Sequence, residues 1–520
     1  MDLPFTVITL ARRGLLAPGR PLRVAAQLRA LRGWGWGLAG ELRQAAARDP
    51  GRSAVVDERG AELTYAELLE RAERLARGMR AALGVRPGDR VGVLCRNHHG
   101  LIEAIVAATL LGADAVLVNT GLSAAQLGTV AQEQRLRVLV HDAGFADRVV
   151  DLPGGVRRLD ERAREELVAD ARPGELRPPG RDGRIVVLTS GTTGAPRGAR
   201  RPTPNGFGPL VSIIDRIPLR TRDRVLIAAP LFHTWGYAAL QVCFALRATV
   251  VLHRRFDPAA TLAALVEQRC DALFAVPVML QRLLEVPPPD PRPPLRVVAV
   301  SGSALPGGLA TSFMDAYGDV LYNLYGSTEV SWASIAGPAD LRAAPTTAGR
   351  PPHGTRLAIL DAAGEPVPAG RVGRIFVGNE LLFEGYTSGA GREHRDGLLD
   401  TGDLGRLDAD GLLFVDGRAD DMVVSGGENV FPAEVEDVIS RLPQVREVAV
   451  IGVPDPEYGQ RLAAFLSLRP GGTLDPEDVR AHVRHHLARF SVPRDVVLVE
   501  KLPRNATGKV LARELRRQQG

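Results

Sequence analysis

The sequence predicts an α/β fold, with a large N-terminal α/β domain of several subdomains and a small α+β unit at the C-terminal end. The chain has 520 residues, which exceeds what one hydrophobic core usually holds. Predicted strands and helices alternate from Ala54 onward, the pattern of layered α/β sheets. From Ala419 the chain forms an α+β pattern of its own. We therefore expect a prefix at residues 1–48, a large domain at 49–418 and a small domain at 419–520.

The first α/β run is marked by a helix start and by short apolar strands. Thr64 followed by Glu67 is a capping box, which predicts a helix that ends near Leu83. The turn residues Pro87-Gly88-Asp89 then precede an apolar strand. Strands are predicted over residues 91–94, 115–118 and 138–141, and helices over residues 98–111 and from Ser123. This order is that of parallel βαβ units.

The later elements follow clear changes in composition. A segment rich in proline, glycine and arginine, residues 173–183, separates the first run from a strand over residues 185–188. A second α/β run covers about residues 224–300. After Gly349 come short strands and glycine turns, and Asp410-Gly411 indicates a hairpin. In the last part we expect helices over residues 433–442 and 476–490, and strands over residues 447–451 and 462–468.

The prefix contains a predicted amphipathic helix over residues 21–38, with three arginines on it and two tryptophans near its end. Such a helix either touches a membrane surface or packs on the main domain, and we favour packing. The start of the chain lacks the regions of a secretory signal, and charged residues interrupt the longest apolar stretches. We expect a cytoplasmic protein without a transmembrane segment, with peripheral membrane contact through the prefix as the alternative.

The composition excludes several function classes. A net charge of +5 is small for this length, and the basic residues are scattered, so nucleic-acid binding has little support. Cys95, Cys243 and Cys270 are isolated, which favours buried thiols over a disulfide framework or a zinc site. Among 65 basic residues only Lys501 and Lys509 are lysine. Where lysine is so rare, a lysine that remains is a candidate for a role that the forked guanidinium of arginine cannot perform.

A loop rich in glycine and hydroxyl groups directly follows the predicted strand at residues 185–188. It reads Thr189-Ser190-Gly191-Thr192-Thr193-Gly194-Ala195-Pro196-Arg197-Gly198. Glycine lets a backbone approach a ligand closely, and hydroxyl and N–H groups bind phosphate oxygens, with Arg197 adding positive charge. The loop lacks the Gly-Lys-Ser/Thr ending of a Walker A motif. We interpret it as a phosphate-binding loop, and a merely flexible turn is the alternative.

Three later segments carry further candidate groups. Tyr325-Gly326-Ser327-Thr328-Glu329 places a hydroxyl beside a carboxylate, a pair that suits a phosphate and Mg²⁺ together. Asp403, in Asp400-Thr401-Gly402-Asp403, is able to accept two hydrogen bonds from a ribose diol. Lys509 lies on a glycine-containing loop, where a cation can stabilise charge as two anions are joined. Taken singly, the two acidic segments are equally consistent with surface turns, and Lys501 is predicted to be a surface residue.

Together the four segments, in this order, resemble the adenylate-forming superfamily, which includes acyl- and aryl-CoA synthetases, peptide-synthetase adenylation domains and beetle luciferases. The resemblance covers about residues 54–517. It implies a large domain of three subdomains and a small, mobile C-terminal lid that rotates about a hinge at Asp420. The family commonly has lysine where this chain has Arg197. Because the charge is kept, we expect a small change in phosphate contact.

The resemblance also implies roles for individual residues. For ATP and AMP they are Thr189, Ser190, Gly191, Thr192, Thr193, Gly194, Arg197, Gly198, Gly302, Ser303, Ala304, Tyr325, Gly326, Ser327, Asp403 and Arg418. The catalytic residues are Lys509, Thr328, Glu329 and His233, and the Mg²⁺ ligands are Glu329 and Thr192. The CoA-binding residues are Ser425, Gly426 and Gly427, and the acyl pocket includes Trp235 and Val276.

The implied reaction has two steps, in which ATP and a carboxylic acid form acyl-AMP and a thiol then takes the acyl group. The segment at residues 426–436 is closer to acyl-CoA synthetases than to luciferases, and no carrier domain follows the lid, so we expect coenzyme A as the acceptor. The prefix and the overall sequence pattern resemble bacterial fatty-acyl-CoA synthetases for medium or long chains. A homodimer is a further expectation. The alternatives are a fatty-acyl-AMP ligase that loads a carrier protein, an aryl- or small-acid CoA ligase, and an inactive nucleotide-binding regulatory module.

Overall fold

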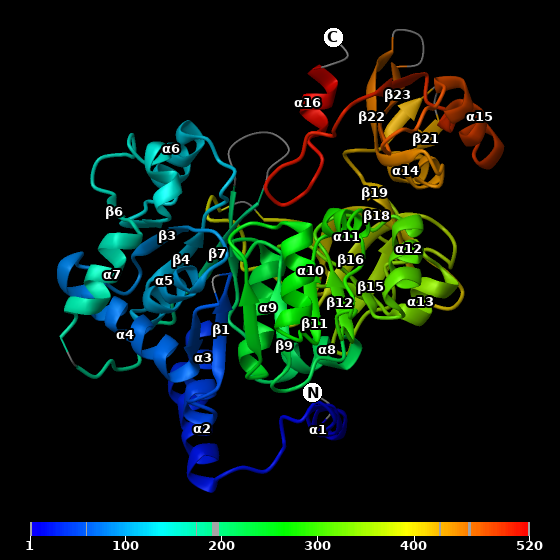
Figure 1. Ribbon diagram of the computed structural model, residues 1–520. Helices are drawn as coiled ribbons and strands as arrows, with labels where there is room; N and C mark the ends of the chain where they lie inside the picture. Colours follow the sequence, from blue (N-terminus) through cyan, green and yellow to red (C-terminus); the bar gives the residue numbers. More distant parts are fainter. Residues whose placement is uncertain are drawn as a thin grey trace.

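The computed structural model describes residues 3–58, 60–172, 174–189, 197–389, 391–425, 428–455 and 459–517. In these ranges the strands form four sheets. Three sheets belong to the large N-terminal part, and the fourth lies in a small unit at the upper right of Figure 1. The predicted combination of a large α/β domain and a small α+β domain is confirmed.

The first sheet has the order β6-β5-β3-β4-β7-β8 and is parallel except for β8. Its strands are β3 (Arg90–Leu94), β4 (Asp114–Leu117), β5 (Val138–His141), β6 (Arg157–Leu159), β7 (Ile185–Thr189) and β8 (Arg197–Arg201). The helices beside it are α4 (Tyr65–Ala82), α5 (His99–Leu110), α6 (Ala124–Glu133) and α7 (Glu161–Asp170), with a 3₁₀ turn at Ala143–Arg148. The capping box that starts α4 is present, because Thr64 accepts from the Glu67 N–H and Glu67 accepts from the Thr64 N–H.

The second sheet has the order β14-β13-β12-β11-β9-β10-β1-β2, parallel except at its two edges. Its strands are β1 (Ser53–Asp57), β2 (Glu62–Thr64), β9 (Arg224–Ile227), β10 (Thr249–Leu252), β11 (Ala272–Ala275), β12 (Val297–Val300), β13 (Leu321–Tyr325) and β14 (Ser334–Ala336). Its helices are α8 (Gly208–Arg216), α9 (Thr234–Ala245), α10 (Pro258–Glu267), α11 (Pro277–Leu284), α12 (Gly307–Tyr317) and α13 (Pro338–Ala343). β1 precedes the first sheet in sequence yet pairs with β10, so the two sheets share one continuous core.

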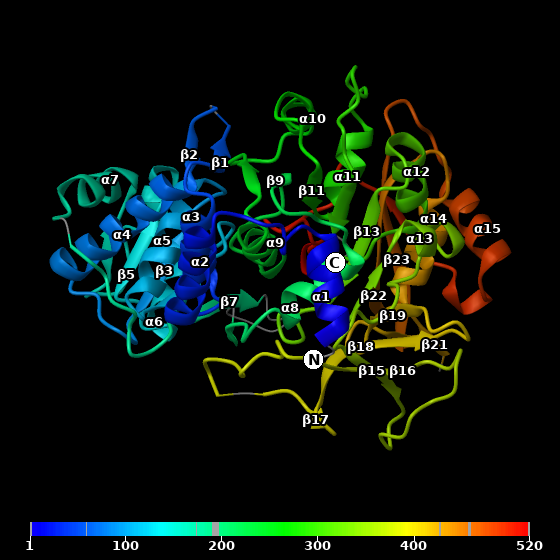
Figure 2. The ribbon, with the colours of Figure 1, turned by 90° about the horizontal axis from the view of Figure 1, so that it is seen from below.

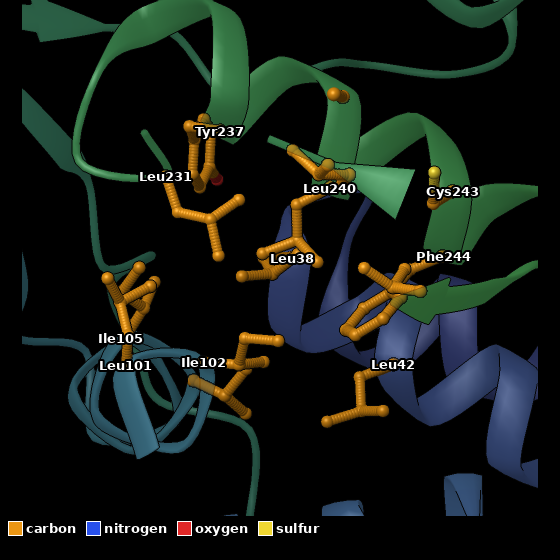
Figure 3. Close-up of a cluster of buried hydrophobic side chains, with 14 of the residues drawn as sticks. Leu38, Leu42, Leu101, Ile102, Ile105, Leu231, Tyr237, Leu240, Cys243 and Phe244 are labelled. Atoms are coloured by element: carbon orange, nitrogen blue, oxygen red, sulfur yellow. The ribbon is translucent and has the colours of Figure 1, made fainter. Parts of the chain in front are cut away.

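The prefix is helical and packs on the large domain. Its helices are α1 (Leu3–Arg12), α2 (Pro21–Trp34) and α3 (Leu38–Arg48). The single helix predicted over residues 21–38 is wrong in extent, because Gly35 has a φ of 72°, in the left-handed region that ends a helix. Leu38 and Leu42 of α3 are buried against α5 and α9 (Figure 3). α1 packs beside α8 (Figure 2), where the Arg13 guanidinium donates to the Ile214 carbonyl oxygen at 2.8 Å.

The third sheet is antiparallel and contains the predicted hairpin. Its strands are β15 (Arg356–Leu360), β16 (Gly373–Gly378), β17 (His394–Arg395), β18 (Leu398–Leu407) and β19 (Leu413–Arg418). β18 and β19 pair around the turn at Asp410-Gly411, as predicted. In their register Asp403 lies opposite Arg418, so two of the predicted nucleotide contacts are cross-strand neighbours.

The small domain has its own sheet, in the order β21-β20-β23-β22, with β24 paired to β23. Its strands are β20 (Val423–Ser425), β21 (Glu428–Val430), β22 (Val445–Asp455), β23 (Gly459–Leu468) and β24 (Asp495–Leu498). Its helices are α14 (Pro432–Ser440), α15 (Pro476–His486) and α16 (Ala512–Arg517), with a 3₁₀ turn at Arg489–Ser491. α15 ends four residues before the predicted position, because Leu487 is already extended.

The small domain contacts the large one through charged side chains and one loop. The Arg446 guanidinium binds both carboxylate oxygens of Glu285, at 2.6 and 2.7 Å, and Asp437 accepts a hydrogen bond from the Gly307 N–H at 3.1 Å. The red loop that precedes α16 descends to the large domain (Figure 1). None of the helices in the described ranges is both long and apolar enough to span a bilayer.

Candidate active site

A cavity of about 380 Å³ lies where the carboxyl ends of parallel strands meet the loop of the small domain. This is the usual ligand position in open α/β sheets. Four predicted residues from distant parts of the chain line it together: Arg197, Glu329, Arg418 and Lys509. The structure therefore brings the four sequence segments to one place.

The loop after β13 holds the acidic corner of this cavity. Glu329 is buried, and the Tyr386 hydroxyl donates to its Oε1 at 2.6 Å. Thr328 Oγ1 lies 2.9 Å from Thr234 Oγ1 at the start of α9. A Cβ added to Gly326 would lie 2.2 Å from the Ser331 carbonyl oxygen, so only glycine fits there. Close packing thus fixes the direction in which Glu329 faces.

The cross-strand pair of the third sheet forms a second polar corner. Arg418 lines the cavity, and its Nε lies 3.5 Å from Asp403 Oδ1. The Tyr325 hydroxyl donates to the other carboxylate oxygen of Asp403 at 2.6 Å. Burial raises the pKa of Asp403 above its ordinary value, although Tyr325 and Arg418 act in the opposite direction. The predicted hinge residue Asp420 is exposed and accepts from Arg418 Nε at 3.3 Å.

Lys509 reaches the cavity from the small domain on a short, ordered turn. Asn505 Oδ1 accepts from the backbone N–H of Thr507 at 3.0 Å and of Lys509 at 2.9 Å. Gly508 has a φ of +85°, and a Cβ there would lie 2.8 Å from Val278 Cγ1 of the large domain. Glycine is thus required both by the backbone angle and by the close contact between the two domains. Lys501 is exposed, as predicted, and unlike Lys509 it is not among the described residues that line the cavity.

The remaining part of the cavity runs along α9. His233 stands at the N-cap position of this helix without a side-chain cap hydrogen bond, and burial, with the Arg201 charge, lowers the pKa of its imidazole to about 4. His233 is therefore neutral at pH 7. Trp235 lines the cavity and donates from Nε1 to the Ala275 carbonyl oxygen at 3.0 Å. Val276 is buried beside Gly302 and Gly508, and it is not among the described residues that line the cavity.

The other predicted nucleotide and CoA residues are placed less directly. Gly302 lines the cavity, whereas Ser303 and Ala304 are exposed on the same loop. Gly198 is packed within β8, where an added Cβ would lie 2.8 Å from Thr387 Oγ1. Packing against neighbouring side chains therefore favours glycine there. Tyr325, Gly326 and Ser327 lie at the end of β13 and in the loop that follows it, and the last two line the cavity.

Several predictions fall on or beside segments that the structure does not describe. Ser190, Gly191, Thr192, Thr193, Gly194, Gly426 and Gly427 lie outside the described residues. Thr189 ends β7 and Ser425 ends β20, at the borders of those segments. The roles of these residues in phosphate, Mg²⁺ and CoA binding stay predictions.

Sequence reasoning missed three groups at this cavity: Tyr386, Arg201 and Glu41. Tyr386 lies in an irregular stretch, far from Glu329 in sequence, so no local pattern indicates its contact. Glu41 is a buried acid on the inner face of α3, in the prefix, where the sequence analysis assigned no site residue. Arg201 alone offered a signal, because an arginine two residues beyond Ala199 on a buried strand faces the same side as that apolar residue.

Comparison with known proteins adds two family matches. The family model described as AMP-binding enzyme matches residues 42–387. The model described as AMP-binding enzyme C-terminal domain matches residues 434–509. The matched ranges include the cavity residues Arg197, Glu329 and Lys509, whereas Arg418 lies between the two ranges.

Curated relatives and solved structures match nearly the whole chain. A feruloyl-CoA synthase from Amycolatopsis sp is 36% identical, over 91% of this chain and 97% of the relative. A 2-succinylbenzoate–CoA ligase from Geobacillus kaustophilus is 33% identical, over 92% of this chain and 97% of the relative. The structure of o-succinylbenzoate CoA synthetase from Bacillus subtilis with its acyl-adenylate has a TM-score of 0.81 at 30% identity, covering 91% and 97%. A Mycobacterium tuberculosis fatty acyl CoA synthetase has a TM-score of 0.71 at 28% identity, covering 93% and 98%.

Proposed function

The chain belongs to the adenylate-forming superfamily of AMP-binding enzymes, and from that premise we propose that this ATP-dependent acid–CoA ligase activates an aromatic carboxylic acid. The observation that carries the proposal is the aromatic wall of the cavity. Rings line it from several elements: Trp36, Trp235, Tyr237, Phe274 and Trp332. Aromatic side chains bind a planar ring favourably through stacked and edge-to-face contacts.

Relatives support this choice of acid. Proteins named for ferulate, 2-succinylbenzoate and indoleacetate match more than nine-tenths of the chain at 31% identity or above. Each name denotes an acid that contains an aromatic ring. The medium- or long-chain fatty acid expected from the sequence remains a prediction, and the assay described below separates it from an aromatic acid.

The residues of the cavity divide the first half-reaction among them. Lys509 supplies the cation between two anions, the acid's carboxylate and the α-phosphate of ATP, where it stabilises the charge of the transition state. Arg418 and Asp403, which lie 3.5 Å apart, are the proposed ribose contacts. Neutral His233, at the start of α9, borders the acyl part without adding charge. The carboxylate then attacks the α-phosphate, and pyrophosphate leaves.

The donor set also suits Mg²⁺. Glu329 offers Oε2, which accepts no hydrogen bond among the described residues, and Thr328 offers a hydroxyl. Carboxylate and phosphate oxygens are the ligands that this ion prefers. When bound, Mg²⁺ supplies charge neutralisation for the triphosphate. Tyr386 holds the other oxygen of Glu329 in place.

In the second half-reaction the thiol of CoA attacks the mixed anhydride and AMP leaves. We propose that the lid turns about Asp420 for this step, withdrawing Lys509 and presenting the segment around Ser425 to the thiol. The exposed position of Asp420, in the turn that joins β19 to β20, is consistent with a hinge. A carrier protein in place of CoA is the alternative acceptor.

Mass spectrometry of the products tests the activity, the acid and the acceptor together. The purified protein is incubated with MgATP and a panel of aromatic, short-chain and long-chain acids, with and without CoA. We expect acyl-CoA from aromatic acids, and only when CoA is present. Products from long-chain acids alone would replace the aromatic assignment with a fatty-acid one. Acyl-AMP that accumulates despite CoA would indicate a carrier-protein ligase.

A further inference from the structure

Arg201 is a buried arginine in the wall of the active-site cavity, and no described residue neutralises it. It ends β8, and only 8% of its surface is exposed. Its Nη2 donates to Ser331 Oγ at 2.9 Å, while Nη1 is buried without a hydrogen-bond partner. Within the described ranges its guanidinium forms no ion pair with a carboxylate. A buried charge without a partner is costly, so a partner supplied by a ligand is the physical expectation.

The nearby acids do not supply that partner. Glu329 attracts Arg201 electrostatically, but its carboxylate is held by Tyr386 and is the candidate Mg²⁺ ligand. Glu41 also lines the cavity, and burial raises the pKa of its carboxyl to about 8, so it is largely neutral at pH 7. Asp182 is exposed at the side pocket described below. The inner part of the cavity therefore carries a positive charge.

Arg201 stands at the junction of two spaces. Beside the main cavity lies a side pocket of about 60 Å³. The two share Arg201, Pro204, Tyr237, Gln241 and Leu381 in their walls. A substituent on an acid that occupies the main cavity would meet the guanidinium as it points toward the side pocket.

Ser331 fixes the guanidinium in this position. Its backbone φ is 63°, an uncommon angle for a residue other than glycine. Its hydroxyl donates to the Leu381 carbonyl oxygen at 2.6 Å and accepts from Arg201. Backbone strain of this kind persists where the surroundings enforce it, and it is frequent at ligand sites. Arg201 is thus held in place before any ligand binds.

We propose that Arg201 determines specificity by binding an oxygen acceptor that the aromatic acid carries in addition to its reacting carboxylate. The acceptor is either a second carboxylate or a hydroxyl or methoxy oxygen on the ring. This inference rests on the proposed function, since it concerns the acyl part of the same site. It predicts that acids without such an oxygen are poor substrates.

The test compares matched acids on the wild type and on Arg201→Met. The acids are cinnamic acid, its 4-carboxy derivative and its 4-hydroxy-3-methoxy derivative, and the readout is kcat/KM for pyrophosphate release. The wild type should prefer at least one substituted acid by about 10- to 100-fold, the range for a hydrogen bond to a charged group. Arg201→Met should lose that preference while keeping its activity on cinnamic acid within a few fold. Preference for the 4-carboxy acid would identify the acceptor as a carboxylate, and preference for the 4-hydroxy-3-methoxy acid would identify it as a ring oxygen.

Two further variants keep the test interpretable. Arg201→Lys retains the positive charge without the planar guanidinium and should show an intermediate preference. Such a result would show that the loss of preference in Arg201→Met does not come from misfolding. Arg200→Met is the matched control, because the neighbouring residue on a strand faces the opposite side and lines neither space.

Two outcomes overturn the inference alone: an equal loss on all three acids in Arg201→Met, or a wild type without preference. The first would place Arg201 at the reacting carboxylate or at a phosphate. A wild type that activates none of the three acids would instead reject the proposed function, and the inference with it.

Discussion

Replacing Glu41 by glutamine should stabilise the large domain at neutral pH. Glu41 lies on α3, 6% exposed, and its carboxylate accepts a single hydrogen bond, from Gln44 Nε2 at 3.2 Å, among the described residues. Burial raises the pKa of this carboxyl from 4.5 to about 8. Glutamine keeps the shape and the acceptor of the protonated acid, and it needs no proton.

The size and sign of the effect follow from the pKa shift. Between pH 4.5 and 8 the folded chain holds a proton that the unfolded chain has released, so stability falls as pH rises through this window. At pH 7 the cost of keeping Glu41 protonated is about 3 kcal/mol, at 1.36 kcal/mol per pH unit. At pH 5 it is less than about 1 kcal/mol. The advantage of Glu41→Gln should therefore grow by about 2 kcal/mol between pH 5 and pH 7.

Urea unfolding followed by tryptophan fluorescence measures this difference. The four tryptophans, Trp34, Trp36, Trp235 and Trp332, all precede the small domain, so the signal reports on the large domain. Glu70→Gln is the control, because Glu70 is an exposed residue of α4 and should change stability by less than about 0.5 kcal/mol. A Glu41→Gln variant that is less stable than the wild type at pH 7, or whose advantage is independent of pH, would refute the reasoning.

Three further predictions concern the site and the lid. Lys509→Ala should slow acyl-AMP formation by about 100-fold or more yet spare thioester formation from supplied acyl-AMP, as measured in separate half-reactions. Tyr386→Phe should raise the Mg²⁺ concentration needed for half-maximal pyrophosphate release by about tenfold, because Glu329 loses its donor. Arg446→Ala should lower the adenylation rate by less than about fivefold, since its pair with Glu285 is partly exposed.

Each of these has an outcome that contradicts it. Equal losses in both half-reactions would remove the step-specific role of Lys509. An unchanged Mg²⁺ titration in Tyr386→Phe would show that Glu329 does not depend on its hydroxyl donor. The wild type at high salt, where the Arg446–Glu285 ion pair is screened, is the comparison for Arg446→Ala. A large loss of adenylation rate in the variant, without a similar loss in the wild type at high salt, would mean that Arg446 does more than pair with Glu285.

Local patterns predicted most of the fold. The capping box at Thr64 and the hairpin around Asp410 are decided by residues within a few positions, and both appear where expected. The extent of the prefix helix was wrong, because its interruption depends on Gly35, and glycine within a helical pattern is often tolerated. The pairing of β1 with β10 was not predicted at all, since it joins residues that are far apart in sequence.

The site residues also fall into two groups: those that short motifs predict and those that depend on the fold. Lys509, Glu329 and Arg418 stand in short motifs and were found from sequence, and the structure brings them together. Arg201 and Glu41 owe their properties to burial, and burial is set by elements that the sequence does not show to be neighbours. We propose that the substrate class depends on such residues, so short motifs indicate the chemistry more directly than they indicate the acid.

The rarity of lysine gains meaning from the geometry. Arg197 and Arg418 line the cavity, so guanidinium groups serve where a fixed, forked cation suffices. Arg504 stabilises the loop of Lys509 by donating to the Gly508 carbonyl oxygen at 2.7 Å. In the proposed mechanism, the cation of Lys509 enters and leaves the cavity with the lid and contacts two different anions. The compact ammonium of lysine, on a flexible chain and with rotatable donors, suits that task. The planar guanidinium of arginine has donors in fixed directions, which suit a single partner. We therefore propose that Lys509 has stayed lysine, in a chain whose basic residues are otherwise arginine except for Lys501, because its cation has to move.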